Sequence, residues 1–335
     1  MLSMLLIIVS CKKDDNSIDS NFLVWDATFT NEWISSGGEN HQTFRNIQYA
    51  FSVTDNDDIS IGISTDEQSY LYILNEEKEI LYESNDSLIT QNLSEGLHHL
   101  VVATRVPGKS GSFDLYFKGK VENIVQLAFE NQSFSDNWIN SAASNYQSFR
   151  SQHYNLSIPA NTYIDVILNT NISSEIYLLQ NGNIVEETDD DILSVAINAG
   201  EYQLVFSTFS ANQSGNFQFE VLGEYDLVEK IETSILSKNG SWMLSGGRNP
   251  ESPNNPKYSI EVSEDGFIDV LLDTNADAYL YLLNGTSVLL ETDDNDFSQF
   301  VEAGEYYIVV ATFLEGVSAD FEITTFGKIE SLTEE

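Results

Sequence analysis

The chain has 335 residues, of which 41% are hydrophobic and 12% aromatic, and 14 basic against 53 acidic side chains give it a formal net charge of −39. This composition is that of a globular protein long enough for two or three domains. The negative charge argues against nucleic acid as a partner, because nucleic-acid affinity comes mostly from cations that displace counterions. A single cysteine excludes an internal disulfide, so packing or bound ions must stabilise the fold.

The first ten residues form an apolar run that is too short for a membrane-spanning helix, which needs about 20 residues. The run instead predicts a signal peptide over residues 1–10. The segment IVSC that ends at Cys11 resembles the lipobox of bacterial lipoproteins, and the KKDD that follows resembles the export signal of Bacteroidetes-type surface lipoproteins. The resemblance implies that Cys11 is acylated, that residues 11–20 are a tether, and that the protein is held at the outer membrane on the cell surface. The alternative is an ordinary cysteine near a frayed terminus.

A long internal repeat organises the rest of the chain. Its three copies read WISSGGENHQTFRNIQY from Trp33, WINSAASNYQSFRSQHY from Trp138 and WMLSGGRNPESPNNPKY from Trp242. Each tryptophan is followed after the same interval by a tyrosine, namely Tyr49, Tyr154 and Tyr258. The period of 104 or 105 residues is far longer than that of a solenoid repeat. Each copy is therefore expected to be a domain with its own core, over residues 21–122, 123–225 and 226–335.

Within each copy the hydrophobic pattern is that of strands. In the third copy Tyr258, Ile260 and Val262 alternate with polar residues, which is the period of a sheet with one buried face. Asn-Gly pairs at 181–182 and 284–285 predict hairpin turns. Seven or eight short strands in about 100 residues predict an antiparallel sandwich. The predicted fold class is therefore all-β, with three tandem antiparallel β-sandwich domains.

Two families resemble these copies, and the third copy matches best. The segments WMLSGGRNPESPNNPKY from Trp242 and GEYYIVVATFLEGVSADFEITTFG from Gly304 are similar to the third domain of calpains, a C2-like β-sandwich. NADAYLYLLNGTSVLLETDDND from Asn275 resembles the pre-peptidase C-terminal domain of secreted bacterial enzymes. The resemblance covers nearly all of residues 20–330. It implies small C2-like or jelly-roll-like sandwiches that serve as binding or interaction modules.

The same residues argue against a protease. Papain-type chemistry needs a thiolate paired with a histidine, and the only cysteine, Cys11, lies in the lipobox. His41, His98 and His99 fall in the first copy and His153 in the second, and the third has none. No GxSxG or HExxH motif occurs in the sequence. We therefore predict a non-catalytic protein.

Calcium is the one cofactor that the sequence suggests. Successive antiparallel strands over 266–272, 278–283, 287–291 and 297–301 would bring two acidic loops to the same end of the third sandwich, and the second copy repeats part of the pattern. Calcium binds six to eight oxygens, often from Asp and Asn side chains on loops. Alternatively, these are turn residues on a solvated surface. The candidate ligands are Asp273, Asn275, Asp277, Asp293, Asp294 and Asp296 in the third copy and Asp189, Asp190 and Asp191 in the second.

The repeated tryptophans and tyrosines also have two interpretations. A tryptophan beside Gly-Gly could stack on a sugar ring, whereas one that recurs at a fixed place in every copy is more simply part of the core. The tyrosines are expected to face inward from strands. Phospholipid binding of the C2 type is disfavoured, because the second copy has Arg150 as its only Lys or Arg.

Two functions remain open at this point. The first is a lipid-anchored surface protein whose modules bind a protein, a glycan or an ion. The second is an accessory or regulatory partner of a separately encoded protease or glycan-degrading system.

Overall fold

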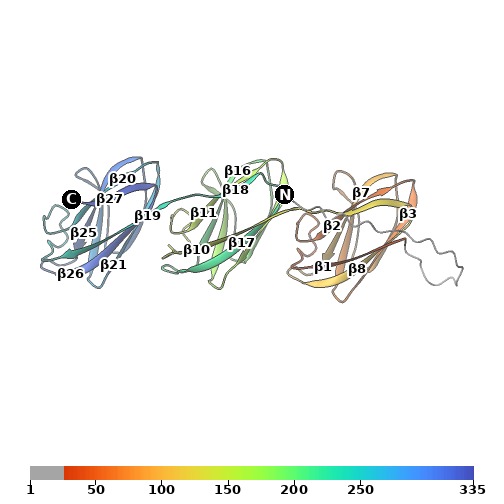
Figure 1. Cartoon of the computed structure of the whole chain (residues 1–335), viewed down its shortest axis with the longest axis horizontal. Helices are drawn as coiled ribbons and strands as arrows, with labels where there is room; N and C mark the ends of the chain where they lie inside the picture. Colours follow the sequence, from red (N-terminus) through yellow and green to blue (C-terminus); the bar gives the residue numbers. More distant parts are fainter. Residues whose placement is uncertain (1–25) are drawn as a thin grey trace. The chain divides into compact units, whose positions relative to one another are not determined.

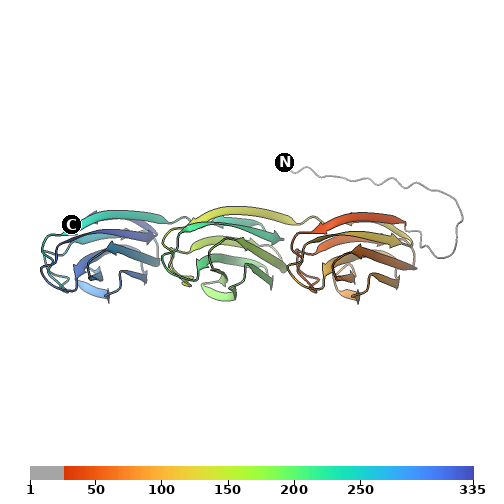
Figure 2. The same ribbon diagram turned by 90° about the horizontal axis from the view of Figure 1, so that it is seen from below.

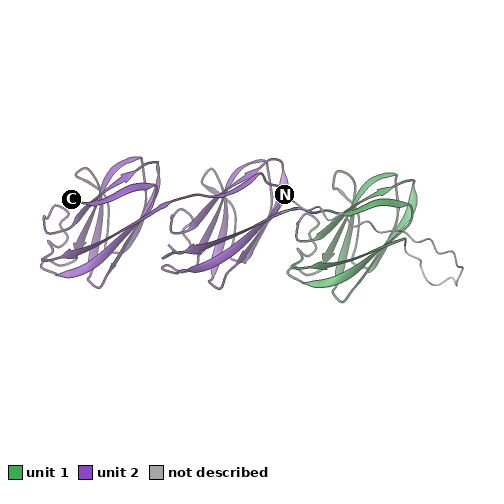
Figure 3. Cartoon of the chain, viewed as in Figure 1, with its two compact units in different colours: residues 1–41, 45–127 green, residues 42–44, 128–335 purple. Residues whose placement is uncertain are grey.

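The computed structural model describes residues 26–335, which form strands and turns and no helix (Figure 1). The expected signal peptide, Cys11 and the tether over 11–20 lie outside the described residues. Contacts between residues divide the chain into two compact units, which are residues 1–41 with 45–127 and residues 42–44 with 128–335 (Figure 3). Among the described residues no helix has the length and hydrophobicity that crossing a bilayer requires.

The first unit holds two antiparallel sheets, in the strand orders β1-β8-β3-β6 and β5-β4-β7-β2-β9. Both sheets come from the first sequence copy. Their strands are β1 (Ala27–Trp33), β2 (Ile47–Val53), β3 (Asp57–Thr65), β4 (Ser69–Leu74), β5 (Ile80–Ser84), β6 (Leu88–Leu93), β7 (Gly96–Thr104), β8 (Gly111–Lys118) and β9 (Val121–Gln126).

The second unit holds four antiparallel sheets, and the strand order of the first unit occurs in it twice. The second copy forms the sheets β10-β17-β12-β15 and β14-β13-β16-β11-β18, and the third forms β19-β26-β21-β24 and β23-β22-β25-β20-β27. The strands of the second copy are β10 (Glu130–Trp138), β11 (Gln152–Ile158), β12 (Thr162–Asn169), β13 (Ser174–Gln180), β14 (Asn183–Thr188), β15 (Ile192–Ile197), β16 (Gly200–Thr208), β17 (Gly215–Gly223) and β18 (Leu227–Lys230). Those of the third are β19 (Ser234–Trp242), β20 (Lys257–Val262), β21 (Gly266–Thr274), β22 (Ala278–Asn284), β23 (Ser287–Thr292), β24 (Asp296–Val301), β25 (Gly304–Thr312), β26 (Ala319–Gly327) and β27 (Ile329–Glu334).

The six sheets come in pairs, and each pair encloses one large apolar core built from a single sequence copy. Figure 2 shows the strands of each copy stacked in layers. The all-β, antiparallel, sandwich-like architecture expected from the sequence is thus confirmed. The strand number differs, since each copy contributes nine strands instead of seven or eight.

The additional strand is the last strand of each copy. In the first two copies it ends beyond the domain boundary expected from the sequence. β9 pairs with β2 and runs to Gln126, past the limit expected at residue 122. β18 starts at Leu227 and pairs with β11, so it belongs to the second copy although it follows residue 225. Both strands lie at a sheet edge and have few buried side chains, which explains why their sequence pattern is weak.

The alternation of buried and exposed side chains is confirmed in β20, where Tyr258, Ile260 and Val262 face the core. In β25 both faces are buried at the carboxyl end, since Val309 and Ala311 belong to a smaller apolar cluster on the outer face of the sheet. The loop after β19 covers part of this cluster, since the Arg248 guanidinium lies 4.6 Å from the centroid of the Tyr279 ring.

Asn-Gly pairs lie at both predicted hairpins, but they take different places in the two turns. Asn181 and Gly182 both have positive φ (52° and 75°) between paired residues Gln180 and Asn183, as a type I′ turn requires. In the third copy Asn284 is itself paired in the ladder, and Gly285 (φ 60°) opens the turn. A glycine in the first turn position is typical of type II′.

Candidate functional site

The repeated tryptophans lie inside the cores. Trp33, Trp138 and Trp242 are 2%, 1% and 2% exposed. Each indole Nε1 donates a hydrogen bond to a backbone carbonyl of the facing sheet, at 2.9 Å to Val102, 3.0 Å to Phe206 and 2.8 Å to Val310. A buried indole with its donor satisfied cannot stack on a sugar in this conformation. The partner tyrosines Tyr49, Tyr154 and Tyr258 are buried in the same cores.

The acidic loops of the third copy lie at one end of the sandwich, as their topology requires. β21 pairs with β24, and the Leu272 amide donates to the Asn295 carbonyl at 2.7 Å. The Asp277 carbonyl accepts from the Phe313 amide at 2.8 Å. The loops that follow β21, β23 and β25 are therefore neighbours.

The carboxylates on these loops do not gather around a common point. Among residues 26–335 no group of three or more His, Cys, Asp or Glu side chains is placed to hold a metal ion. Asp273, Asp277, Asp293 and Asp294 are exposed. Asp296 instead forms an ion pair with Arg150, at 2.6 Å between Oδ2 and Nη1. The described carboxylates thus do not converge on a calcium site in this arrangement, and the same holds for Asp189, Asp190 and Asp191.

Arg150 lies in the loop between β10 and β11 of the second copy, a position for which the sequence predicts no structural role. This guanidinium is 2% exposed and holds its own loop by donating from Nε to the Asn140 carbonyl at 2.5 Å and from Nη2 to the Ser141 carbonyl at 2.8 Å. Nη2 also donates to Asn212 Oδ1 at 2.9 Å. The remaining donor, Nη1, points out of the copy toward Asp296.

The same loop makes a polar joint with the third copy. Ser148 Oγ donates to Asp269 Oδ1 at 2.7 Å, and the Phe149 amide donates to Oδ2 of the same carboxylate at 2.7 Å. With the pair between Arg150 and Asp296, three donors of the second copy reach two carboxylates of the third. Hydrogen bonds to charged groups are stronger than neutral ones and require specific geometry, so they favour one arrangement of this joint.

Asp269 lies in the middle of β21 and is fully buried, with no exposed surface. Burial raises the pKa of this carboxyl, and the donors from Ser148 and Phe149 and the charge of Arg150 oppose that rise. Position 298 on β24, which is a serine, lies opposite it in the ladder. A buried carboxyl supplied with several donors is a structural group that tolerates few replacements.

His153 contacts two residues of the same loop, Ser148 and Phe149. Its Nε2 lies 2.9 Å from the Ser148 carbonyl, and its ring packs against Phe149 with centroids 5.2 Å apart. Burial lowers the pKa of His153, and the bond to Ser148 opposes this only in part. The ring is therefore neutral near pH 7, and the neutral tautomer that carries the proton on Nε2 donates to the carbonyl.

A short connection completes the joint. Only residues 231–233 separate β18 of the second copy from β19 of the third. The Ile231 amide donates to the His153 carbonyl at 2.8 Å, and Lys328 Nζ donates to the Glu232 carbonyl at 2.8 Å. These bonds tie the three-residue connection to both copies and leave it little conformational freedom.

The donors of this joint recur earlier in the sequence. Residues 42–44 group with the second unit, and there Thr43 Oγ1 donates to Asp165 at 2.8 Å and the Phe44 amide donates to Asp165 Oδ2 at 2.8 Å. Asp165 occupies in β12 the place that Asp269 occupies in β21, and Ser194 lies opposite it in the ladder. The arrangement of a hydroxyl, an amide and a buried carboxylate thus occurs twice.

A signal for these residues was present in the sequence. The triplet IDV occurs in the second and third copies, ending at Val166 and Val270, and it places a charge inside an apolar strand pattern. The loops contain TFR and SFR at equivalent places, ending at Arg45 and Arg150. Neither triplet alone indicates a joint, because only the packing of two copies brings loop and strand together.

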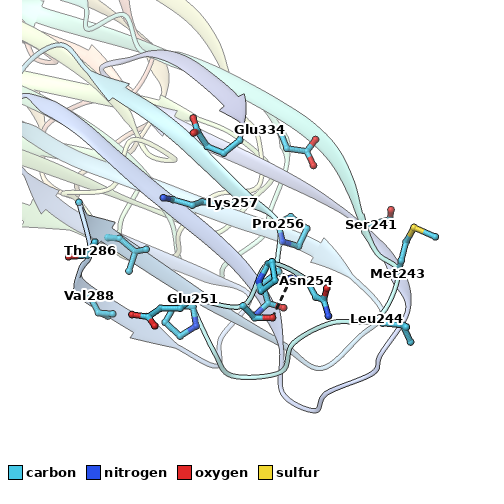
Figure 4. A pocket seen from close by; sticks show the side chains of 17 residues that line it. Ser241, Met243, Leu244, Glu251, Asn254, Pro256, Lys257, Thr286, Val288 and Glu334 are labelled. Atoms are coloured by element: carbon cyan, nitrogen blue, oxygen red, sulfur yellow. Dashed lines mark hydrogen bonds between the residues drawn. The ribbon is translucent and has the colours of Figure 1, made fainter.

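The corresponding loop of the third copy lines an open groove. The groove has a volume of about 620 Å³, and its lining includes Glu251, Asn254, Pro256, Lys257 and Glu334 (Figure 4). Its charged lining residues are Lys257 and three glutamates, Glu251, Glu334 and Glu335.

Comparisons with known proteins leave the family open. No family model matches the chain, and no curated protein matches it. Two solved structures are similar in part. One is the major capsid protein P2 from Bacteriophage PM2, at 10% identity over 60% of this chain and 98% of that chain, with a TM-score of 0.19. The other is a chain of the entire lipid-containing bacteriophage PM2, at 11% identity over 90% and 100% of the two chains, with a TM-score of 0.20. Likenesses this weak carry no argument about fold or function.

Proposed function

We propose that the chain is a non-catalytic surface lipoprotein, anchored through an acylated Cys11 at the outer membrane. Its three copies are tandem antiparallel β-sandwich domains of about 100 residues, C2-like or jelly-roll-like, that act as calpain domain III-like binding and interaction modules. The modules present a binding surface, to a protein or a glycan, outside the membrane.

The observation that carries this proposal is the joint at Asp269. A buried carboxylate with donors from the preceding copy, together with a three-residue connection, favours modules that are held in a defined relation. An interaction protein benefits from such joints, because ordering modules before binding lowers the entropy cost of binding. The structural use of Arg150 and His153 is consistent with the same reading, since these polar side chains serve the joint.

The anchor is tested in a bacterium that exports lipoproteins. The wild-type chain should incorporate labelled palmitate, fractionate with the outer membrane and be digested when protease is added to intact cells. Cys11→Ser should lose the label and the membrane association. Unlabelled wild-type protein in the soluble fraction would contradict the proposal.

A further inference from the structure

The joint consists of a donor half and an acceptor half, and each copy has a position for both. The donor half is the loop triplet at 43–45 and 148–150, which supplies a hydroxyl and a backbone amide. The acceptor half is the buried aspartate at Asp165 or Asp269. The two halves lie on different parts of a copy, so copies joined in this way follow one another head to tail. Such an assembly can add further copies at either end.

The donor half is altered in the third copy. The residues at the place of Ser148, Phe149 and Arg150 are Ser252, Pro253 and Asn254. Proline has no backbone N–H, so the donor that Phe149 supplies to a carboxylate is absent. Asn254 lacks the charge with which Arg150 reaches a second carboxylate.

The loop of the third copy also keeps its shape by other means. Asn255 is 5% exposed and bonds to four groups of its own loop, accepting from Ser245 Oγ and the Gly246 amide and donating to the Gly247 and Asn249 carbonyls. The loop is thus ordered without an arginine at the place of Arg150, while Pro253 and Asn254 are exposed. The altered triplet therefore changes the exposed surface of the loop and leaves the internal hydrogen bonds of the loop in place.

The acceptor half is altered in the first copy. Ser60 occupies in β3 the place of Asp165 and Asp269, opposite Thr90 in the ladder. Its hydroxyl bonds to Thr90 Oγ1 at 2.9 Å. A small hydroxyl already paired across the strands offers no carboxylate to a donor loop.

We infer that the first and third copies carry sealed ends, whose residues prevent the head-to-tail addition of a second copy of this chain. The intact halves are used inside the chain, and the two altered halves are the ones that would meet between chains. A head-to-tail joint between two different faces that does not close into a ring would otherwise build open filaments. This inference depends on the joint and not on the anchor at Cys11.

The test restores one half at a time in the full chain. Ser60→Asp rebuilds the acceptor, and the double variant Pro253→Phe, Asn254→Arg rebuilds the donor. Each variant alone should sediment as a monomer, because its complementary half is missing. An equimolar mixture should form a 1:1 dimer as the concentration approaches about a millimolar, the effective concentration that a short linker provides. Adding Ser252→Ala to the donor variant should weaken the dimer at least several-fold by removing the hydroxyl donor.

A mixture that stays monomeric at that concentration overturns the inference, as does wild-type chain that associates end to end through residues 60 and 253. If a restored variant does not fold, the reverse exchange is decisive. Phe149→Pro with Arg150→Asn places the third copy's triplet in the second copy, and it should speed proteolysis within residues 231–233 at least tenfold. Unchanged cleavage would show that the triplet does not carry the joint.

Discussion

At the scale of single residues, the second copy has an alanine at a position where the other two copies have a glycine with positive φ. Gly38 and Gly247 have φ of 70° and 63°, in the left-handed region, whereas the equivalent residue of the second copy is Ala143, with φ of 60°. A side chain in this region costs about 1 kcal/mol relative to glycine.

Ala143→Gly is therefore expected to stabilise the protein by about 1 kcal/mol in the free energy of unfolding, because it removes this strain. The measurement is urea denaturation followed by tryptophan fluorescence. Ala142→Gly is the matched control, since its φ is negative and the change should destabilise by about 0.5–1 kcal/mol. Equal losses from both substitutions would contradict the assignment.

His153 makes the stability depend on pH. Burial lowers its pKa below the ordinary 6.5, so the unfolded chain binds a proton at mildly acid pH that the folded chain does not. Its contribution is complete above pH 6.5 and is lost as pH falls toward the lowered pKa. Thermal melts from pH 7.5 to 5 should show a fall in melting temperature that His153→Gln reduces. A slope equal in both proteins would rule this out.

At the scale of elements, the strands could be predicted well and the joint could not. The strands expected at 266–272, 278–283 and 287–291 occur at 266–274, 278–284 and 287–292, because alternating apolar residues and turn residues determine them locally. Edge strands such as β27 bury few side chains and give little signal. The joint depends on two copies meeting, and an aspartate inside a strand has the same appearance in sequence whether it faces solvent or a donor loop.

The buried carboxylate at position 269 can be tested by truncation. Asp269→Ala leaves the Ser148 hydroxyl and the Phe149 amide without an acceptor and should cost about 3 kcal/mol in urea denaturation. Asp269→Asn should cost less, since an amide can accept from Phe149 and donate to Ser148. Asp273→Ala, an exposed site on the same strand, is the control and should change stability by less than about 0.5 kcal/mol. Equal effects at 269 and 273 would refute the joint.

The acidic loops give a prediction of their own. Because Asp296 is paired with Arg150 and the neighbouring carboxylates are exposed, millimolar calcium should leave the melting temperature where sodium chloride of equal ionic strength leaves it. Calorimetric melting in both salts measures this. A saturable rise in calcium alone, abolished by Asp293→Asn with Asp294→Asn, would establish the ion site that the sequence suggests.

At the scale of the whole molecule, a three-residue connection and the contacts at Asp269 hold the third copy to the second. The short connection and the polar contacts at Asp269 predict one preferred relation between the two copies, whereas a connection without such contacts would allow many. Surface modules joined in this way can present binding faces with defined spacing. Without the contacts of the joint, the second and third copies would reorient independently of each other.

The most direct measurement is the distance distribution between spin labels on the two copies. Glu187→Cys and Glu291→Cys place labels at equivalent exposed positions of the second and third copies, in a Cys11→Ser background that removes the only other thiol. We expect a single narrow distribution, which Asp269→Ala broadens and Asp273→Ala leaves unchanged. A broad distribution in the otherwise unaltered chain, insensitive to Asp269→Ala, would contradict the account.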